Sequence, residues 1–217
     1  MKIVVTRPRA QAAPLVERLT ALGHEVIVCP LIEVEPTGPE AVDVSGYKWV
    51  VVTSPNGAEQ LALRRHGRLA RVAAVGPGTA EALAAHGIAV DLVSPVSTQE
   101  GLVAELRRQT AGRVLFVGAE GARQYLVEHL QADFVPLYRT VPVRPPAPPD
   151  GDLVVLASAS AARAFAGLGA PIPAVSIGPQ TTAAALKGGV QVVAEARSHD
   201  LDGLVAAVEN AARRPVP

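Results

Sequence analysis

Loops rich in small polar residues and glycine follow the apolar runs of this sequence, at points where a helical pattern begins. There are six of them, at residues 6–9, 53–57, 76–79, 118–121, 158–160 and 178–181. The first N–H groups of a helix are unpaired and the helix dipole is positive there, so such loops attract anions. Glycine lets an anion approach the backbone closely. The six loops together predict a ligand with several negative groups, such as a polycarboxylate.

Helix capping is the simpler interpretation of any single loop, because Ser, Thr and Asn are favoured N-caps. The repetition over six loops makes a binding surface the better interpretation of the set. The candidates for substrate binding in these loops include Asn56, Gly118, Ser160 and Gly178.

Tyr138 is the candidate catalytic residue. It lies where the chain is expected to cross between two lobes, and it brings a weak acid to the expected cleft. A phenol can act as a general acid where the leaving group needs only a proton or a strong hydrogen bond. The alternative is that Tyr138 packs under the connector and has no chemical role.

Motifs of other common enzyme classes are missing from the sequence. There is no GxxxxGK[ST] phosphate loop and no HExxH pair, and the Gly-Pro-Gly of residues 76–78 lacks the spacing of a dinucleotide-binding loop. The single cysteine, Cys29, excludes a disulfide framework and a Cys-based zinc site, and its apolar neighbours predict a buried thiol. We therefore expect no metal site. His199 is expected to cap the helix that follows it.

The composition indicates a folded protein without a strong bias in charge. The chain has 217 residues, of which 49% are hydrophobic and 18% charged, enough for one large domain or two smaller ones. Twenty basic and twenty acidic side chains cancel, which argues against a general binder of nucleic acid or of anionic membranes. No long uncharged apolar window and no secretory signal is found, so we expect a soluble cytoplasmic protein.

An internal repeat organises the chain. Residues 75–80 match residues 177–182 at an offset of 102, and residues 100–103 match residues 202–205 at the same offset. Two further matches keep the same order along the chain: 52–56 with 156–160, and 15–19 with 126–130. Four ordered matches are hard to attribute to chance similarity between Ala-rich helices. The repeat therefore predicts a gene duplication.

Each copy is predicted to alternate buried strands with helices. The expected strands are 3–6, 25–29, 49–53, 72–75, 90–93, 113–117, 134–135, 153–157, 174–177 and 190–194. The expected helices are 10–21, 56–65, 78–86, 99–109, 121–131, 160–166, 180–187 and 201–212. Short Val/Ile/Leu runs are typical of parallel strands buried on both faces, and the helices supply the crossovers. The predicted fold is α/β, with two doubly wound parallel-sheet lobes.

The expected domain boundaries do not fall between the two copies. One break is near residues 35–39 and the other is the proline-rich segment 142–149, each just after the second strand of its copy. The ends of the chain, 1–34 and 148–217, should thus form one discontinuous lobe, and residues 38–138 the other. Residues 33–37 and 139–147 would be a two-stranded connector. The alternative is two sequential lobes that divide near residue 111.

The ordered motifs resemble those of the uroporphyrinogen-III synthase family over essentially the whole chain. The segments that carry the resemblance are 5–8 (Val-Thr-Arg-Pro), 53–57 (Thr-Ser-Pro-Asn-Gly), 75–80 (Val-Gly-Pro-Gly-Thr-Ala), 100–102, 138–140 (Tyr-Arg-Thr), 158–160, 177–181 and 201–204. Each motif is weak alone, whereas their order and spacing together are fairly specific.

The resemblance implies two α/β lobes joined by a β-ladder, and the substrate hydroxymethylbilane, an open tetrapyrrole with eight carboxylates. It implies a lyase that removes the terminal hydroxyl, inverts ring D and closes the macrocycle without a metal or an organic cofactor. The tyrosine that matches Tyr138 is proposed in that family to help hydroxide depart. Residues that match positions lining the family's cleft are Ser54, Thr79, Ser158 and Thr181, and Arg7 matches a position near it. A monomer without nucleic-acid or membrane partners is expected.

Two other functions stay open at this point. A two-lobed small-molecule binding protein would share the cleft and the hinge but perform no reaction. An enzyme that handles nucleotides or sugar phosphates could share the α/β core, although the missing phosphate loop and dinucleotide fingerprint speak against it.

Overall fold

The computed structural model describes residues 1–109 and 112–213. The chain forms two compact units: Met1–Glu33 with Thr140–Pro217 make the first, and Val34–Arg139 make the second. The chain therefore passes from one unit to the other twice.

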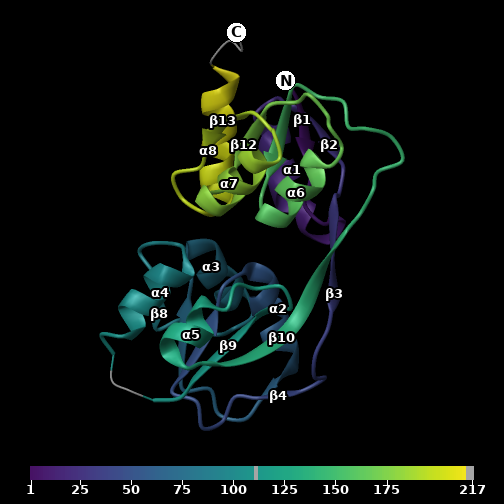
Figure 1. The fold of residues 1–217 in the computed structure, drawn as a ribbon. Helices are drawn as coiled ribbons and strands as arrows, with labels where there is room; N and C mark the ends of the chain where they lie inside the picture. The colour runs from purple at the N-terminus through teal and green to yellow at the C-terminus, as the bar shows by residue number, and fades with distance from the viewer. Residues whose placement is uncertain (110–111, 214–217) are drawn as a thin grey trace. The chain divides into compact units, whose positions relative to one another are not determined.

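The first unit is built on a five-stranded sheet with the order β13-β12-β11-β1-β2 (Figure 1). Its strands are β1 (Lys2–Val5), β2 (Glu25–Val28), β11 (Leu153–Leu156), β12 (Ala174–Ser176) and β13 (Val192–Glu195). All neighbouring pairs are parallel. Because parallel strands are joined by crossover helices on both faces, the central strands β1, β11 and β12 are buried on both sides, whereas the edge strands β2 and β13 are less buried.

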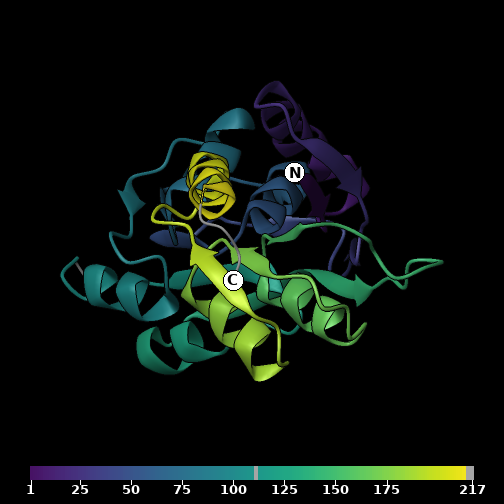
Figure 2. The ribbon, with the colours of Figure 1, turned by 90° about the horizontal axis from the view of Figure 1, so that it is seen from above.

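Four helices cover the two faces of this sheet. They are α1 (Arg9–Ala21), α6 (Ala159–Ala166), α7 (Pro179–Lys187) and α8 (Leu201–Ala212). Figure 2 shows α1 and α8 on one side of the sheet and α6 and α7 on the other. Side chains alternate between the faces along each strand, so Ile3 packs with Leu15 and Leu204 on one side. The neighbouring Val4 packs with Phe165 on the other side.

The second unit repeats this layered arrangement. Its main sheet has the order β3-β10-β9-β5-β7-β8, and β4 pairs with β6 separately. The strands are β3 (Ile32–Pro36), β4 (Val42–Asp43), β5 (Trp49–Val52), β6 (Arg65–His66), β7 (Arg71–Ala74), β8 (Leu92–Val93), β9 (Val114–Ala119) and β10 (Asp133–Pro142). Its helices are α2 (Pro55–Arg64), α3 (Pro77–Ala85), α4 (Gln99–Leu106) and α5 (Tyr125–Leu130). The first two pack on one face, and the last two on the other.

The α/β class with parallel sheets is thus confirmed, and the two sheets share one strand order. The first reads β2-β1-β11-β12-β13, and the second reads β10-β9-β5-β7-β8 once its additional edge strand β3 is set aside. In each of these five-strand orders, two strands from one predicted copy lie beside three strands from the other. A duplication would account for this order, and it stays a prediction.

One matched glycine pair has the same packing environment in both units. A Cβ on Gly101 would lie 2.2 Å from the Val96 carbonyl oxygen, and one on Gly203 would lie 2.0 Å from the Ser198 carbonyl oxygen. Both glycines donate their N–H to the helix cap, Gly101 to Thr98 and Gly203 to Asp200. Close backbone contact therefore explains this glycine in the repeated motif.

Strand β10 corrects one sequence prediction. A short strand at 134–135 and a separate connector at 139–147 were expected, whereas β10 is one strand from Asp133 to Pro142. It ends there because the prolines between residues 145 and 149 supply no N–H group to a ladder.

The neighbour of β10 at the edge of the sheet is β3. The Thr37 N–H donates to the Leu137 carbonyl over 3.0 Å, and the Val143 N–H donates to the Leu31 carbonyl over 2.9 Å. The numbering rises on one strand as it falls on the other, so the two strands are antiparallel.

No helix in residues 1–109 and 112–213 is both long and apolar enough to cross a membrane. Over the same ranges, no three His, Cys, Asp or Glu side chains are grouped so that they could hold a metal ion. Cys29 is buried, and this burial raises the pKa of its thiol.

Candidate functional site

Tyr138 is buried in the second unit and hydrogen-bonded at its hydroxyl. Its side chain is 5% exposed, and its hydroxyl oxygen lies 2.8 Å from the Ser54 Oγ. Burial raises the pKa of the Tyr138 phenol, while hydrogen bonds with Ser54 and Asn56 act in the opposite direction. The phenol therefore keeps its proton at neutral pH and has a hydroxyl partner that can stabilise it after proton loss.

Ser54 holds its position because it caps a helix. Its Oγ accepts a hydrogen bond from the Gly57 N–H over 3.0 Å at the start of α2. A Cβ on Gly57 would lie 3.2 Å from that Oγ and 3.3 Å from a Val52 methyl group, so a side chain would crowd the cap. The capping role expected of such loops is thus present, and Ser54 still contacts Tyr138.

The parallel strands of the second unit place its candidate residues along one sheet edge. Tyr138 pairs with Ala119 at the end of β9, the Ser54 loop follows β5, and Thr79 follows β7. These strands are neighbours in the sheet, and ligands of open α/β sheets bind beyond the carboxyl ends of the strands.

Two binding candidates of this unit, Thr79 and Gly118, are buried. Thr79 is 4% exposed in the first turn of α3. Gly118 is buried within β9, where a Cβ would lie 3.1 Å from the Phe116 ring. Packing against Phe116 accounts for this glycine.

The first unit carries an equivalent row of loops after β1, β11 and β12. Ser158 caps α6 by accepting the Ala161 N–H over 3.1 Å, with nearly the same backbone angles as Ser54. Thr181 is 3% exposed in the first turn of α7. The two rows of loops therefore share their serine helix caps. They differ in that Ser54 also forms a hydrogen bond with the hydroxyl of Tyr138.

Arg7 differs from the other arginines of the first unit. It follows β1 at the carboxyl end of the strand and is partly buried. Burial lowers the pKa of its guanidinium, and no charged neighbour contributes to this shift. Within residues 1–109 and 112–213, no hydrogen-bonding, ion-pair or aromatic partner accompanies it. A partly dehydrated, unpaired guanidinium at this edge is suited to bind a carboxylate.

His199 corrects the capping prediction. The cap of α8 is Asp200, which accepts the Gly203 N–H over 2.7 Å. The His199 ring instead lies over Gly178, where a Cβ would be 2.8 Å from the ring atoms Cδ2 and Nε2. Gly178 is thus needed for the ring to approach the start of α7. The matching position in the first copy, Ser97, lies over Gly76 in the same way.

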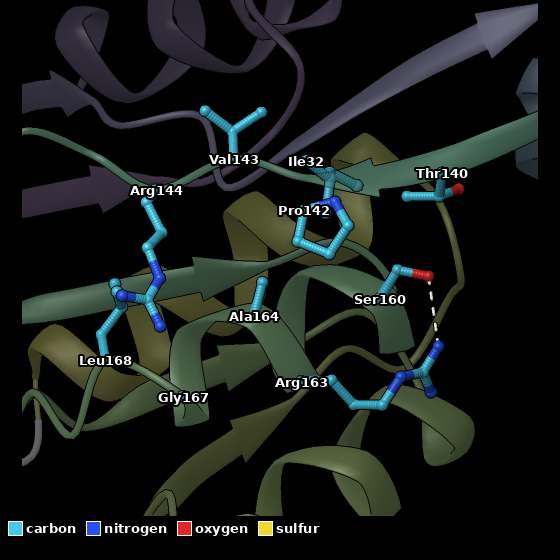
Figure 3. Close-up of a pocket in the computed structure, with 10 residues that line it drawn as sticks. All are labelled: Ile32, Thr140, Pro142, Val143, Arg144, Ser160, Arg163, Ala164, Gly167 and Leu168. Atoms are coloured by element: carbon cyan, nitrogen blue, oxygen red, sulfur yellow. Dashed lines mark hydrogen bonds between the residues drawn. The ribbon is translucent and has the colours of Figure 1, made fainter.

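A pocket of about 380 Å³ lies in the first unit beside α6 (Figure 3). Its lining residues are Ile32, Thr140, Pro142, Val143, Arg144, Ser160, Arg163, Ala164, Gly167 and Leu168. Figure 3 shows Arg144 at the side of Leu168 and Arg163 at the side of Ser160, with apolar side chains between. Arg163 donates to the Ser160 Oγ over 3.3 Å. Neither arginine forms an ion pair with an acidic side chain in the described ranges.

Sequence reasoning selected Ser160 in this pocket and missed both arginines. Arg163 could have been found from its spacing, because a residue three positions after Ser160 lies on the same side of α6. Arg144 stands in the proline-rich segment, where no periodicity gives its direction.

Comparisons with known proteins agree on one family. The family model for uroporphyrinogen-III synthase HemD matches residues 13–206. The uroporphyrinogen-III synthase of Synechococcus elongatus is 31% identical, over 98% of this chain and 96% of its own. The chain is also similar to the solved structure of a mutant uroporphyrinogen III synthase from Thermus thermophilus, with a TM-score of 0.61, 17% identity and coverage of 98% and 99% of the two chains. It is similar as well to the solved structure of uroporphyrinogen-III synthetase from Helicobacter pylori. The TM-score is 0.61 and the identity 17%, over 96% of this chain and 98% of that one. At 17% identity, these two structures support the fold alone.

Proposed function

Because the chain belongs to the uroporphyrinogen-III synthase family, we propose that it closes hydroxymethylbilane into a macrocycle with inversion of ring D and loss of water. The observation that carries this function is the family match over residues 13–206, which includes every candidate site residue except Arg7. Synthases of this family are cofactor-independent cyclising lyases that act on hydroxymethylbilane.

Tyr138 is proposed as the general acid. As the bond between the terminal methylene carbon and its hydroxyl oxygen breaks, the phenol gives its proton to that oxygen and water departs. The electron pair of the pyrrole nitrogen stabilises the carbon left behind, as an N-protonated azafulvene whose positive charge balances the Tyr138 phenolate. Transfer of that N–H proton to the phenolate leaves the neutral azafulvene and restores the phenol. The support for this role is the protonated, buried phenol and its 2.8 Å contact with the Ser54 hydroxyl, which can donate a hydrogen bond to the phenolate.

Binding and orientation are proposed for the loops at the sheet edges. N–H groups at the first turns of α3, α6 and α7 that lie outside the caps can hold carboxylates without many lysines, which suits a chain with no net charge. Once the azafulvene forms, the protein must mainly keep ring D where attack at its substituted carbon is favoured. Orientation of this kind can supply a large part of a rate acceleration.

The pocket beside α6 is proposed to receive one pyrrole unit and its carboxylate arms. Its apolar side chains match the ring, and Arg144 and Arg163 match the arms. In the double variant Arg144→Met/Arg163→Met we expect KM to rise about 3- to 10-fold with kcat within about twofold, because each exposed charge contributes about 1 kcal/mol or less. Lys187→Met on α7, which also removes an exposed cation of this unit, is the matched control. An unchanged KM in steady-state assays would remove the pocket from the binding surface.

The isomer of the product tests the function itself. Purified protein is mixed with enzymatically made hydroxymethylbilane, and the uroporphyrinogen isomers are separated after oxidation. We expect the type III isomer, whereas uncatalysed closure leaves ring D uninverted and produces type I. Type I alone, together with tight binding of the substrate, would instead indicate a two-lobed binding protein.

Three further properties belong to the same proposal. We propose that the two compact units act as two domains, which is supported by the separate sheet and the separate cores of each. We also propose a monomer and a cytoplasmic location. Sedimentation velocity and cell fractionation test these two properties.

A further inference from the structure

A β-bulge in β10 lies immediately before Tyr138. Pro136 pairs with Gly118 and Tyr138 pairs with Ala119, so Leu137 is an extra residue on β10. Consecutive residues of a regular strand point to opposite faces. Here Leu137 packs in the core that contains Ala58 and Leu61 of α2, and Tyr138 also reaches α2, through Ser54. The bulge lets two consecutive side chains approach the same helix.

Arg64 holds the backbone of this bulge. It is the last residue of α2, and its Nη2 donates to the Leu137 carbonyl and to the Gln60 Oε1. Its Nη1 donates to the Thr37 carbonyl over 2.6 Å and to the Pro39 carbonyl over 3.2 Å. One guanidinium thus ties the bulge carbonyl to the loop after β3, and the planar fork of arginine suits several fixed acceptors.

The loop after β3 lies directly against the bulge. Gly38 has a φ of +73°, and a Cβ on it would lie 2.0 Å from the Pro136 carbonyl oxygen. The Thr37 N–H also donates to the Leu137 carbonyl, over 3.0 Å. The Leu137 carbonyl therefore accepts both a backbone N–H and Arg64, and no side chain separates the loop from β10.

Helix α2 contacts β10 at both of its ends. Ser54 caps its start and bonds the Tyr138 hydroxyl, while Arg64 at its last residue bonds the Leu137 carbonyl. A helix is rigid along its axis. These two contacts therefore fix both the backbone from which the Tyr138 side chain extends and the position of its hydroxyl group. Loss of the Arg64 contact would leave the Leu137 carbonyl with the Thr37 N–H alone and would release the bulge from the end of α2.

We propose that Arg64 is a positioning residue for the reaction, which sets the location of the Tyr138 hydroxyl by fixing the bulge at Leu137. It touches neither the phenol nor, on this assignment, the substrate. The assignment rests on the proposed function, because it presumes that Tyr138 acts on the leaving hydroxyl.

The test combines kinetics with a spectroscopic signal from Tyr138. The chain has three tyrosines, so protein labelled with 3-fluorotyrosine has three ¹⁹F resonances, and Tyr138→Phe identifies the one in question. In Arg64→Met we expect kcat to fall about 10- to 100-fold, as for a small misplacement of a reacting group, with KM within about twofold. The Tyr138 resonance should shift or broaden while that of Tyr125 stays in place.

Arg68→Met is the matched control, since Arg68 is exposed and close in sequence, and it should change neither readout. Arg64→Lys keeps the charge but not the fork, so we expect an effect between wild type and Arg64→Met. It also serves as the test variant if Arg64→Met does not fold. A folded Arg64 variant with wild-type kcat, or with an unmoved Tyr138 resonance, overturns the assignment. Failure of the wild-type protein to make the type III isomer would refute the proposed function instead. The ¹⁹F spectra would still show whether Arg64 positions the Tyr138 side chain.

Discussion

Tyr138→Phe is expected to lower kcat about 10²- to 10⁴-fold, the range that a positioned general acid contributes. The substitution removes one hydroxyl and keeps the ring that packs in the second unit. The Ser54 Oγ retains its bond from the Gly57 N–H, so we expect the free energy of unfolding to change by only about 1 kcal/mol. Single-turnover rates on hydroxymethylbilane and thermal unfolding measure the two quantities.

Tyr125→Phe is the control for this variant. The Tyr125 ring stacks on His129 at a centroid distance of 3.8 Å in the same unit, and Phe keeps that stack. We expect its kcat to match the wild-type value. If Tyr138→Phe also turned over at the wild-type rate, Tyr138 would be a packing residue and the proton would have to come from another group.

The pH dependence of kcat follows from the direction of the pKa shift. Burial raises the pKa of Tyr138 above its ordinary value of about 10, so the acid form persists as the pH rises through the neutral and mildly alkaline range. No decline assignable to Tyr138 is therefore expected between about pH 7 and pH 9. A fall in that range that Tyr138→Phe abolishes would mean that the phenol ionises much more readily than its burial implies.

Arg7→Gln is expected to raise KM about 10- to 100-fold, because a hydrogen-bonded charge contributes about 1.5–3 kcal/mol. Arg7 is partly buried after β1, with no partner among the described residues, so a substrate carboxylate would be the group that neutralises it. Removing an unpaired, partly dehydrated charge should leave the fold equally stable or more stable. A structural arginine would show the opposite pattern, with lower stability and an unchanged KM.

Arg9→Gln provides the comparison, since Arg9 is exposed two residues further along at the start of α1. It should change KM by less than about twofold, as exposed charges usually do. Steady-state kinetics and thermal unfolding of the two variants, made side by side, separate binding from stability. Equal KM values for Arg7→Gln and wild type would exclude Arg7 from the binding surface.

Local sequence patterns were sufficient to predict the α/β class and most of the helices and strands. The apolar run of β5, the start of α2 to within one residue of Pro55 and the full length of α8 all follow from periodicity and capping. The loops at the strand ends were also predictable, because a parallel sheet places all its carboxyl ends on one edge. Ser54 and Ser158 could therefore be selected as paired residues before their geometry was known.

Contacts between distant segments were not predictable in the same way. The continuous strand β10 and its bulge depend on the register with β9, which periodicity alone does not specify. The burial of Thr79, the ring of His199 over Gly178 and the lack of a partner for Arg7 among the described residues depend on packing by other elements. None of these has a local signal in the sequence.

The sequence by itself determined the class of fold, the order of its helices and of most of its strands, and the motifs of the family, because these depend on neighbours along the chain. Only the tertiary structure decided that Tyr138 meets Ser54, 84 residues away, and that Arg64 meets the carbonyl of Leu137, 73 residues away. The physical reason is that hydrogen bonds form between atoms a few ångströms apart in space. Whether two residues reach that distance depends on the register and packing of every element between them.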